Sequence, residues 1–455
     1  MREVIAAIST GPVLSAIGIV RLSGDGTLPI MDQVFRPADG RPMSAHPDRQ
    51  LVYGTLLDEN GRVLDLCLAT ISHGPGSYTG EDTGELQCHG SPVVLRQALS
   101  SLFARGARQA KAGEFTRRAF LNGRMDLTQA EAVIDLIDAE TPQAARNAAG
   151  QLSGAIARRT DAVYRDLRDI CAHYHAVLDY PDEDIPPFEL RAYARTLEEG
   201  IASLSALLAT FSRGRFLEKG VPTAIVGKPN VGKSSLLNAL LGYERAIVTD
   251  IPGTTRDTLS ERCSLGGVAL RLTDTAGLRQ SADAVEALGV ERAVEALRDA
   301  GLVIAVFDTS RPWEAEDETV AAECAGVSAR IAVCNKADLP PLWSPERLRD
   351  RFETVVSLSA ATGEGLDALE RAVAVLFPLP AVAAGEILTN ERQAEAIAEA
   401  LDYLAAARNA MTEGWPPDAV LTECEGAMEA LGTLSGKTVR QDVTERIFSR
   451  FCVGK

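Results

Sequence analysis

The sequence predicts a multidomain α/β and α+β protein: an α+β domain, a discontinuous α-helical domain, and an α/β domain inserted into the helical one. Three observations predict this fold. The 455 residues correspond to about three domains of ordinary size. Short β-rich runs separated by turn residues precede residue 120, and helical periodicity begins at residue 128. Between residues 217 and 378, apolar strand-like runs alternate with helical patterns, which is typical of a parallel sheet with helices on both faces.

Composition and charge exclude several classes of protein. A hydrophobic content of 46% excludes a disordered chain, and the sequence contains neither a signal peptide nor the run of about 18 apolar residues that spans a membrane. The eight cysteines include no C-x-x-C pair, which argues against a zinc ribbon or a disulfide framework. The net charge of −17 means that any contact with nucleic acid is local. We therefore expect a cytoplasmic protein without membrane contact.

The first 120 residues predict the α+β domain. Asn60-Gly61 separates two β-rich runs, residues 51–57 and 63–71, which is the pattern of a β-hairpin. Ser91-Pro92 predicts the start of a helix, because serine is a common N-cap and proline fits the first helical position. That helix is expected to end before Gly106.

The periodicity becomes helical from residue 128. Thr128-Gln129-Ala130-Glu131 matches a capping box, and helix is expected to about residue 211 and again over 391–411. Near the chain end an apolar stripe at steps of four predicts a further helix: Val439, Val443, Ile447 and Phe451. These patterns indicate one helical domain interrupted by the α/β domain. Two separate helical domains are the alternative.

The α/β domain contains a phosphate-binding motif. Residues 227–234, G-K-P-N-V-G-K-S, match G-x-x-x-x-G-K-[ST] and lie between a strand-like run and a helical run. Backbone N–H groups of such a loop surround phosphate oxygens at a helix N-terminus. Lys233 is expected to reach the β- and γ-phosphates, and the Ser234 hydroxyl can bind Mg²⁺.

Three further motifs follow strand-like runs and indicate a guanine nucleotide. Asp274-Thr275-Ala276-Gly277 can support the Mg²⁺ shell and meet the γ-phosphate. In Asn335-Lys336-Ala337-Asp338, the Asp338 carboxylate can accept two hydrogen bonds from guanine N1–H and N2–H₂, which adenine does not donate. Ser359-Ala360-Ala361 completes the set.

Two segments bear on hydrolysis. Leu278 occupies the position where Ras-like proteins have the glutamine that orients the attacking water, so another polar residue must do this. Glu286 is a candidate for that role, and a solvated helix residue is the alternative. The hydroxyl-rich loop T-D-I-P-G-T-T-R-D at 249–257 is expected to contact the γ-phosphate and the metal, with Thr255 completing the Mg²⁺ shell.

The chain resembles the MnmE (TrmE) family of tRNA modification GTPases. The resemblance rests on the motifs above together with Gly80-Glu81-Asp82, G-E-F-T-R-R-A-F-L-N-G at 113–123, Gln129-Ala130-Glu131-Ala132 and F-C-V-G-K at 451–455. It covers essentially the whole chain. The short G motifs occur in many GTPases, whereas the blocks of the first domain and the Cys-x-Gly-Lys end are specific to this family.

The resemblance implies a domain organisation and partners. Residues 1–120 would form the domain that makes a homodimer and binds a reduced folate, and residues 216–379 a Ras-like G domain with a mainly parallel sheet. Residues 121–215 and 380–455 would form the two parts of the helical domain. With MnmG (GidA), as a heterotetramer, family members modify wobble uridine (U34) of certain tRNAs to its 5-carboxymethylaminomethyl or aminomethyl form. The folate, 5-formyl- or methylene-tetrahydrofolate, supplies a one-carbon unit and MnmG supplies FAD.

The site residues of the G domain carry over by position. The resemblance implies K⁺ bound by Asn230, Thr249, Ile251 and Thr254, supplying the charge that an arginine finger supplies elsewhere, and Mg²⁺ bound by Ser234 and Thr255. Glu286 matches the water-orienting glutamate, and Arg279 is its neighbour in the same switch. The full set expected to contact GTP is Asn230, Val231, Gly232, Lys233, Ser234, Ser235, Thr249, Asp250, Ile251, Pro252, Gly253, Thr254, Thr255, Asp274, Thr275, Ala276, Gly277, Asn335, Lys336, Ala337, Asp338, Ser359, Ala360 and Ala361.

Arg21, Glu85, Arg124 and Lys455 match the folate-binding positions of the family. A carboxylate such as Glu85 can accept hydrogen bonds from the pterin amino group and ring N–H, and the basic groups can pair with polar or anionic parts of the cofactor. Two features differ from the family. Residue 124 is more often lysine, and residues 9–16 replace a glycine-rich loop.

Cys452 is a candidate nucleophile. A thiolate can add to carbon 6 of uridine and leave again, and a buried helical cysteine is the alternative.

A basic segment is a candidate surface for tRNA or the folate tail. It contains one acid, Glu114, and six cations: Arg105, Arg108, Lys111, Arg117, Arg118 and Arg124. A solvated face or an intramolecular salt-bridge surface is the alternative.

Three functions are compatible with these motifs. The first is a K⁺-dependent GTPase whose hydrolysis drives conformational change in a tRNA-modifying complex. The second is a GTP-dependent ribosome-assembly switch without modification chemistry, which would need neither the folate positions nor the terminal motif. The third is a nucleotide-binding scaffold with negligible turnover.

Overall fold

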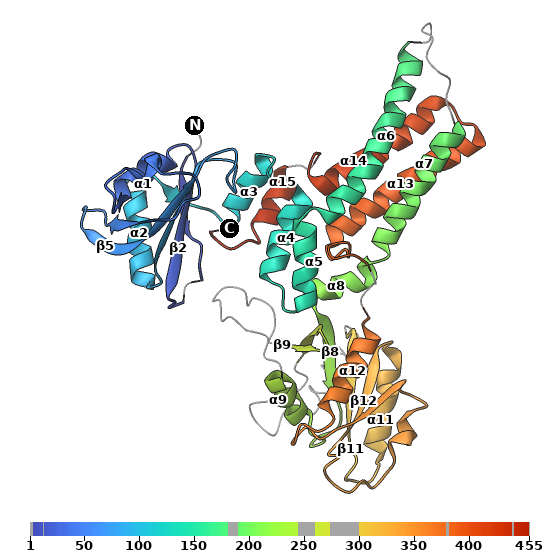
Figure 1. Ribbon diagram of the computed structural model, residues 1–455. Helices are drawn as coiled ribbons and strands as arrows, with labels where there is room; N and C mark the ends of the chain where they lie inside the picture. Colours follow the sequence, from blue (N-terminus) through green and yellow to red (C-terminus); the bar gives the residue numbers. More distant parts are fainter. Residues whose placement is uncertain are drawn as a thin grey trace. The chain divides into compact units, whose positions relative to one another are not determined.

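The computed structural model describes residues 3–11, 13–180, 190–243, 260–273, 300–378, 382–438 and 441–454. The chain, shown in Figure 1 with colours that follow the sequence, divides into two compact units. The first contains Met1–Ile134, Leu152–Gly200 and Glu399–Lys455, and the second contains Asp135–Gln151 and Ile201–Ala398. Both units are therefore built from segments that are distant in the sequence.

The first unit contains a seven-stranded sheet in the order β3-β4-β5-β6-β2-β1-β7. Its neighbouring strands are antiparallel except for β1 and β7. The predicted hairpin at Asn60-Gly61 is confirmed, since β4 and β5 pair on either side of it. The strands are β1 (Ile5–Ile8), β2 (Ile17–Ser23), β3 (Phe35–Pro37), β4 (Val52–Leu57), β5 (Val63–Ser72), β6 (Thr83–His89) and β7 (Arg108–Gln109).

Helices cover the two faces of this sheet differently. The helices α1 (Thr27–Val34) and α2 (Pro92–Phe103) pack on the face that holds the main apolar core, with the short 3₁₀ turn η1 (Met43–Ala45) beside them. The predicted start of α2 after Ser91 is confirmed, but the serine side chain makes no capping hydrogen bond. The helix α3 (Glu114–Leu121) packs Phe115 against Ile5 and Ala7, whose side chains point to the other face.

The predicted helical segments are confirmed. They are α4 (Leu127–Ile137), α5 (Pro142–Leu152), α6 (Ala155–Asp179), α7 (Leu190–Leu208), α13 (Glu391–Glu413), α14 (Pro417–Ser435) and α15 (Gln441–Phe448). Helices α6 and α14 pack antiparallel. Near the start of α6, an Asp161 carboxylate oxygen lies 3.3 Å from Nζ of Lys437, which follows the end of α14, and near the end of α6, His175 Nε2 lies 2.9 Å from a Glu425 carboxylate oxygen within α14.

Two local predictions in these helices were wrong. The cap of α4 is formed by Asp126, whose carboxylate accepts from the Gln129 N–H at 2.8 Å, while the Gln129 side chain accepts from the Asp126 N–H at 3.0 Å. Thr128 donates to the same carboxylate at 2.6 Å, so it is a partner of the cap and not the cap itself. In the stripe near the chain end, Val439 lies outside the described residues, and the helix that contains Val443 and Ile447 ends at Phe448. Phe451 lies beyond α15, where it packs with Phe448 in one apolar cluster.

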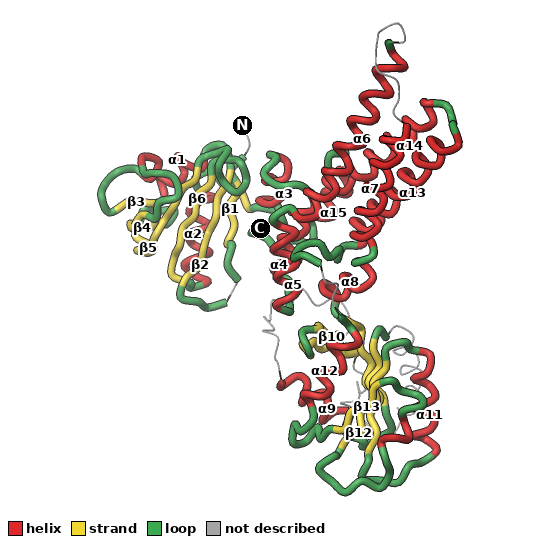
Figure 2. The backbone as a smooth tube through the Cα atoms, turned by 45° about the vertical axis from the view of Figure 1, so that its right-hand side comes forward, coloured by secondary structure: helices red, strands yellow, loops and turns green. Residues whose placement is uncertain are grey.

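The second unit contains a six-stranded sheet in the order β13-β12-β11-β8-β10-β9. Strands, including β10, β12 and β13 of this sheet, are yellow in Figure 2. The predicted parallel arrangement is confirmed for all pairs except β9 and β10, which form an antiparallel hairpin. The strands are β8 (Val221–Val226), β9 (Ser260–Leu265), β10 (Val268–Thr273), β11 (Leu302–Asp308), β12 (Arg330–Asn335) and β13 (Thr354–Ser357).

Both faces of this sheet are apolar and covered by helices. α9 (Lys233–Tyr243) and α12 (Leu366–Leu376) contribute to the core on one face, and α11 (Ala315–Glu323) contributes to the core on the other. The unit also contains α8 (Phe211–Lys219) and the 3₁₀ turns η2 (Cys324–Gly326) and η3 (Pro345–Leu348). Within the described segments, no helix has the length and apolar character needed to cross a bilayer.

Candidate functional site

The predicted phosphate loop joins β8 to α9. At Gly227 the backbone has φ 150°, and a Cβ atom there would lie 2.4 Å from the Val306 carbonyl oxygen. At Gly232 φ is 102°, and a Cβ atom would lie 2.2 Å from the Asn335 side-chain nitrogen. Because no other residue fits these two positions, the glycines of the motif are required by the close approach of neighbouring strands.

The loop holds its own lysine. Lys233 Nζ donates to the carbonyl oxygens of Gly227 at 2.7 Å and Lys228 at 2.9 Å, and burial lowers the pKa of this lysine. Ser234 and Ser235 are exposed in the first turn of α9. Their hydroxyls and the free N–H groups of this turn are open to an anion or a metal ion.

Asn335 connects three of the predicted motifs. It ends β12 and is 2% exposed. Its side-chain nitrogen donates to the Val231 carbonyl at 2.8 Å, and its side-chain oxygen accepts from the Ala360 N–H at 3.0 Å. The structure therefore brings the phosphate loop, the Asn-Lys-Ala-Asp motif and the Ser-Ala-Ala motif to one edge of the parallel sheet. Asp338 is exposed beside them.

Asp308 is a functional candidate that the sequence analysis missed. Its fully buried carboxylate lies 2.6 Å from Lys336 Nζ, which also donates to the Asn230 carbonyl oxygen at 3.3 Å. Burial alone would raise the pKa of Asp308, but hydrogen bonds from Lys336 and Ser310 hold it below its usual value. Asp308 ends β11 as Asn335 ends β12, so the same search at strand ends could have found it.

Lys228 also has a role that the sequence analysis did not identify. Its Nζ lies 2.8 Å from Glu314 and 2.7 Å from Asp317, the two residues of the capping box that starts α11. Burial opposes the charge of Lys228, but these hydrogen bonds raise its pKa. The ion pairs attach the phosphate loop to α11 across more than 80 residues, a contact that sequence patterns do not indicate.

Several predicted site residues lie outside the described residues. They include the loop expected to bind the γ-phosphate and metals, the second nucleotide motif, the two switch residues and one folate position. These residues are Thr249, Asp250, Ile251, Pro252, Gly253, Thr254, Thr255, Asp274, Thr275, Ala276, Gly277, Arg279, Glu286 and Lys455.

The predicted folate residues Arg21 and Glu85 form an ion pair in the first unit. They face each other on β2 and β6, with Arg21 Nε 2.8 Å from a Glu85 carboxylate oxygen. The Arg21 guanidinium carbon lies 5.7 Å from the ring centre of Tyr78 and 5.9 Å from that of Phe115. Burial raises the pKa of Tyr78. The aromatic rings were not predicted, although Tyr78 lies just before the Gly80-Glu81-Asp82 block.

Arg124 lies beside the same loop that carries Tyr78. A Cβ atom on Gly80 would lie 3.3 Å from Arg124 Cγ, and the Asn122 side chain donates to the Thr79 carbonyl at 2.7 Å. Arg124 is exposed, and its guanidinium makes no hydrogen bond or ion pair among the described residues. The structure thus places Arg124, Arg21 and Glu85 around one loop.

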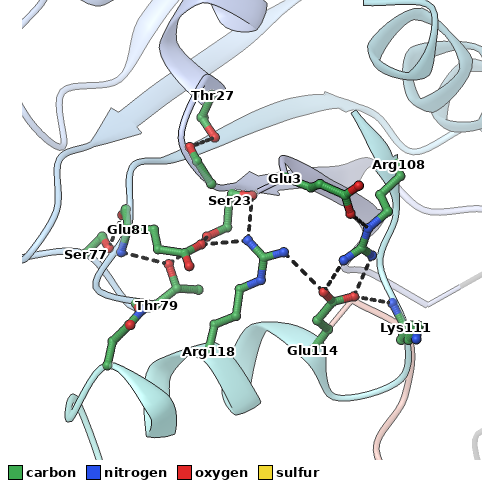
Figure 3. A network of polar contacts seen from close by, with 12 residues as sticks. Glu3, Ser23, Thr27, Ser77, Thr79, Glu81, Arg108, Lys111, Glu114 and Arg118 are labelled. Atoms are coloured by element: carbon green, nitrogen blue, oxygen red, sulfur yellow. Dashed lines mark hydrogen bonds and ion pairs between the residues drawn. The ribbon is translucent and has the colours of Figure 1, made fainter. Parts of the chain in front are cut away.

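Two of the six cations of the predicted basic surface, Arg108 and Arg118, belong to an intramolecular ion-pair network, shown in Figure 3. The guanidinium nitrogens of Arg118 lie 2.8 Å from a Glu81 carboxylate oxygen and 3.2 Å from a Glu114 carboxylate oxygen. Those of Arg108 lie 2.6 Å from a carboxylate oxygen of Glu114 and 2.7 Å from one of Glu3. These contacts, with burial opposing them, lower the pKa of Glu114 to about 2. The salt-bridge alternative is therefore correct for Arg108 and Arg118. Two of their three acidic partners, Glu3 and Glu81, lie outside the basic segment. The charges within the segment alone therefore did not indicate these ion pairs.

The chain end lies on the N-terminal sheet. Gly113 N–H donates to the Cys452 carbonyl at 3.4 Å, Val453 forms an antiparallel bridge with Ala112, and the Ser9 hydroxyl donates to the Gly454 carbonyl at 3.1 Å. Cys452 is exposed and lies beyond α15, so the buried helical alternative for this cysteine was wrong.

Comparison with known families and proteins covers the whole chain. Residues 4–124 match the family model of the GTP-binding protein TrmE N-terminus, and residues 127–452 match that of the MnmE helical domain. The tRNA modification GTPase MnmE of Symbiobacterium thermophilum is 42% identical over 100% of this chain and 99% of its own length. A protein of the same name from Thermus thermophilus is 44% identical over 100% of both chains. Among solved structures, the G domain of the T. maritima FeoB iron transporter is 28% identical, covering 34% of this chain and 96% of that one, with a TM-score of 0.26. Since both family models and full-length relatives agree, the chain belongs to the MnmE family of tRNA modification GTPases.

Proposed function

We propose that the chain binds and hydrolyses GTP and that this activity serves the modification of tRNA. The observation that carries the proposal is the position of Asn335, which joins the phosphate loop to the two motifs expected to surround guanine. The full-length relatives named tRNA modification GTPase support the same conclusion. A ribosome-assembly switch would not account for the match of residues 4–124 to the family's N-terminal domain.

Lys233 changes partners when nucleotide binds. Two carbonyl oxygens of the loop hold its ammonium group, at 2.7 and 2.9 Å. Phosphate oxygens compete for the same group with a full negative charge, which makes the stronger hydrogen bond. Asp338, exposed at the same sheet edge, accepts the two guanine donors. Mg²⁺, held by Ser234 and Thr255, would neutralise charge on the β- and γ-phosphates.

The loop residue Asn230 fits a K⁺ ligand. It has φ 64°, and its side-chain amide has no hydrogen-bond partner among the described residues. An amide oxygen left free at the rim of a phosphate loop suits a weakly hydrated cation. K⁺ would supply positive charge at the transferring phosphate, with Thr249, Ile251 and Thr254 as its other ligands and Glu286 orienting water.

The face around Arg21 and Glu85 fits a reduced folate. Thr70 lies opposite Glu85 on β5, and its buried hydroxyl has no hydrogen-bond partner within the described part of the chain. Glu85 offers acceptors for the pterin amino group, and the Tyr78 ring lies beside the Arg21 guanidinium. Arg124 and Lys455 would pair with anionic parts of the cofactor, which supplies a one-carbon unit.

The same sheet face supports a homodimer. Ile17 is 60% exposed, Tyr53 is 55% exposed and Leu66 is 51% exposed. The strand register and the alternation of side chains put these three on the face that carries Arg21. A second copy would cover this apolar surface. MnmG and tRNA are the further partners we propose, and the cytoplasm is the compartment.

We propose that Cys452 acts near the folate face. Its neighbours Val453 and Gly454 contact Ala112 and Ser9, close to the end of β1, which pairs with β2. An exposed thiol there could add to carbon 6 of a uridine. This role rests on the position of the residue and on the chemistry of thiolates.

The test combines hydrolysis and modification. The purified chain should bind GTP in preference to ATP and release phosphate, and it should restore U34 modification to a deletion strain, measured by mass spectrometry of tRNA nucleosides. Lys233→Ala should abolish both, whereas Lys219→Ala, which removes an exposed lysine at the end of α8, should retain both. Normal U34 modification by the Lys233→Ala chain would refute the link between GTP and modification.

A further inference from the structure

Two buried thiols face each other in the core of the N-terminal sheet. Cys67 on β5 and Cys88 on β6 lie directly opposite, because the register pairs their neighbours Leu68 and Gln87. Cys67 is 5% exposed and Cys88 is 1% exposed. The two sulfur atoms lie within 4.8 Å of each other, and the neighbouring thiol of Cys67 together with burial raises the pKa of Cys88 far above its usual value.

A carboxylate completes the cluster. Asp65 lies two residues before Cys67 on the same strand, so the two side chains share a face of the sheet. A carboxylate oxygen of Asp65 and the two sulfur atoms all lie within 4.8 Å of one another. The Asp65 side chain is only 9% exposed, so its charge is largely withdrawn from water beside the two sulfurs.

His89 orients this carboxylate. Its backbone N–H donates to one oxygen of Asp65 at 2.8 Å, and its ring Nδ1 lies 2.7 Å from the other oxygen. The histidine ring itself is 74% exposed. Outer groups of this kind commonly fix the direction of a metal-binding side chain.

We propose that Asp65, Cys67 and Cys88 bind a thiophilic divalent cation of the zinc class, with His89 as a positioning residue. A tetrahedral ion about 2.3 Å from two sulfurs and about 2.1 Å from an oxygen separates these atoms by roughly 3.6 to 3.8 Å. That separation is compatible with the structure, in which the carboxylate oxygen and the two sulfur atoms all lie within 4.8 Å of one another. Two thiolates and one carboxylate outweigh the two positive charges of the ion by one negative charge, and the cluster supplies three of the four ligands of a tetrahedral ion.

The donor set selects the type of ion. Sulfur ligands favour Zn²⁺ over Mg²⁺ and Ca²⁺, which prefer oxygen. The cysteines lie on different strands and form no C-x-x-C pair, so only the pairing of β5 with β6 assembles the site. Binding replaces two thiol protons by one Zn²⁺ ion, the protons pass to solvent, and no electron is transferred.

The experiment uses the full-length chain, reduced, freed of metal with a chelator and titrated with Zn²⁺ alone in weak buffer. We expect one Zn²⁺ per chain and about two protons released per ion. Co²⁺ in place of Zn²⁺ should produce thiolate-to-cobalt charge-transfer absorption. Cys67→Ala and Cys88→Ala should each abolish the stoichiometric site. His89→Ala should keep the stoichiometry and weaken the affinity about 10- to 100-fold.

Two control variants separate this site from other thiols. Cys171 is also in contact with a second buried thiol, Cys424, but within the described part of the chain this pair belongs to no three-ligand cluster. Cys171→Ala and Cys452→Ser, which removes the exposed thiol, should therefore both retain stoichiometric binding.

Four results would overturn the proposal. They are the absence of stoichiometric Zn²⁺ binding at micromolar concentration, the absence of proton release, equal loss of binding in the Cys171→Ala chain, and a Cys67–Cys88 disulfide found by mass spectrometry in the freshly purified protein. Because alanine variants can fail to fold, the proton count and the cobalt spectrum of the unaltered chain decide the question independently.

Discussion

Replacing Arg118 by methionine should destabilise the N-terminal domain strongly. Arg118 is 8% exposed and pairs with Glu81 and Glu114, whose side chains are 6% and 11% exposed (Figure 3). Removing one partner of a buried ion pair leaves uncompensated charge and costs about 3 to 5 kcal/mol. Arg108 still pairs with Glu114 in this variant, so Glu81 is the carboxylate most affected by the loss of Arg118.

The matched control is Arg108→Met. Its side chain is 38% exposed, and Glu114 would retain Arg118. Because Arg108 is partly solvated and Glu114 keeps Arg118, the loss of stability should be smaller than in Arg118→Met. Comparing the two variants therefore separates the effect of burial from the loss of one arginine.

Hydrogen exchange measured by mass spectrometry is the appropriate assay, because it reports the stability of α3 and of the 77–82 loop separately from the rest of a multidomain chain. A loss of about 3 to 5 kcal/mol corresponds to roughly a hundredfold or greater increase in exchange for Arg118→Met. If exchange in the two variants agreed within about threefold, the reasoning from buried charge would be refuted.

The network also predicts a dependence on pH. Glu114 has its pKa lowered to about 2 from the ordinary 4.5, so its contribution to the stability of the wild-type chain is fully present above pH 4.5. That contribution is lost as the pH falls toward 2.

Five further predictions concern function. Asp338→Asn exchanges an acceptor for a donor, so it should weaken GTP binding by about 2 to 3 kcal/mol and strengthen the binding of xanthosine triphosphate, both measured by calorimetry. Unchanged GTP affinity would show that Asp338 does not contact the base. GTP hydrolysis should be slower in Na⁺ than in K⁺ at matched ionic strength, and Asn230→Lys should reduce this difference; equal rates of the wild-type chain in both salts would contradict a K⁺ site. Glu286→Ala should slow single-turnover hydrolysis with GTP affinity nearly unchanged, and a parallel loss of affinity would argue against a role confined to the attacking water. Deleting residues 452–455 should abolish U34 modification but not GTP binding. Cys452→Ser should abolish modification with normal thermal stability, whereas full modification by that variant would remove the thiol from the mechanism.

Local patterns in the sequence were sufficient to predict most elements of this protein and the nucleotide motifs. The Asn60-Gly61 hairpin and the helical periods after residue 127 depend on neighbours in the chain, which the sequence displays directly. The phosphate loop could also be predicted, because its glycines and lysine serve one short turn between a strand and a helix. Parallel strands then bring Asn335 to the same edge, as their carboxyl ends must meet there.

Only the tertiary structure decided which side chains become partners across long separations. Glu81 and Arg118 are 37 residues apart, and the Ser9 hydroxyl meets the Gly454 carbonyl across 445 residues. Such contacts depend on strand register and on the packing of whole elements, which composition and spacing do not encode locally. For this reason the basic segment was open to interpretation as a binding surface until its buried acids were located. The same reason applies to Cys67 and Cys88, which become neighbours only when β5 pairs with β6.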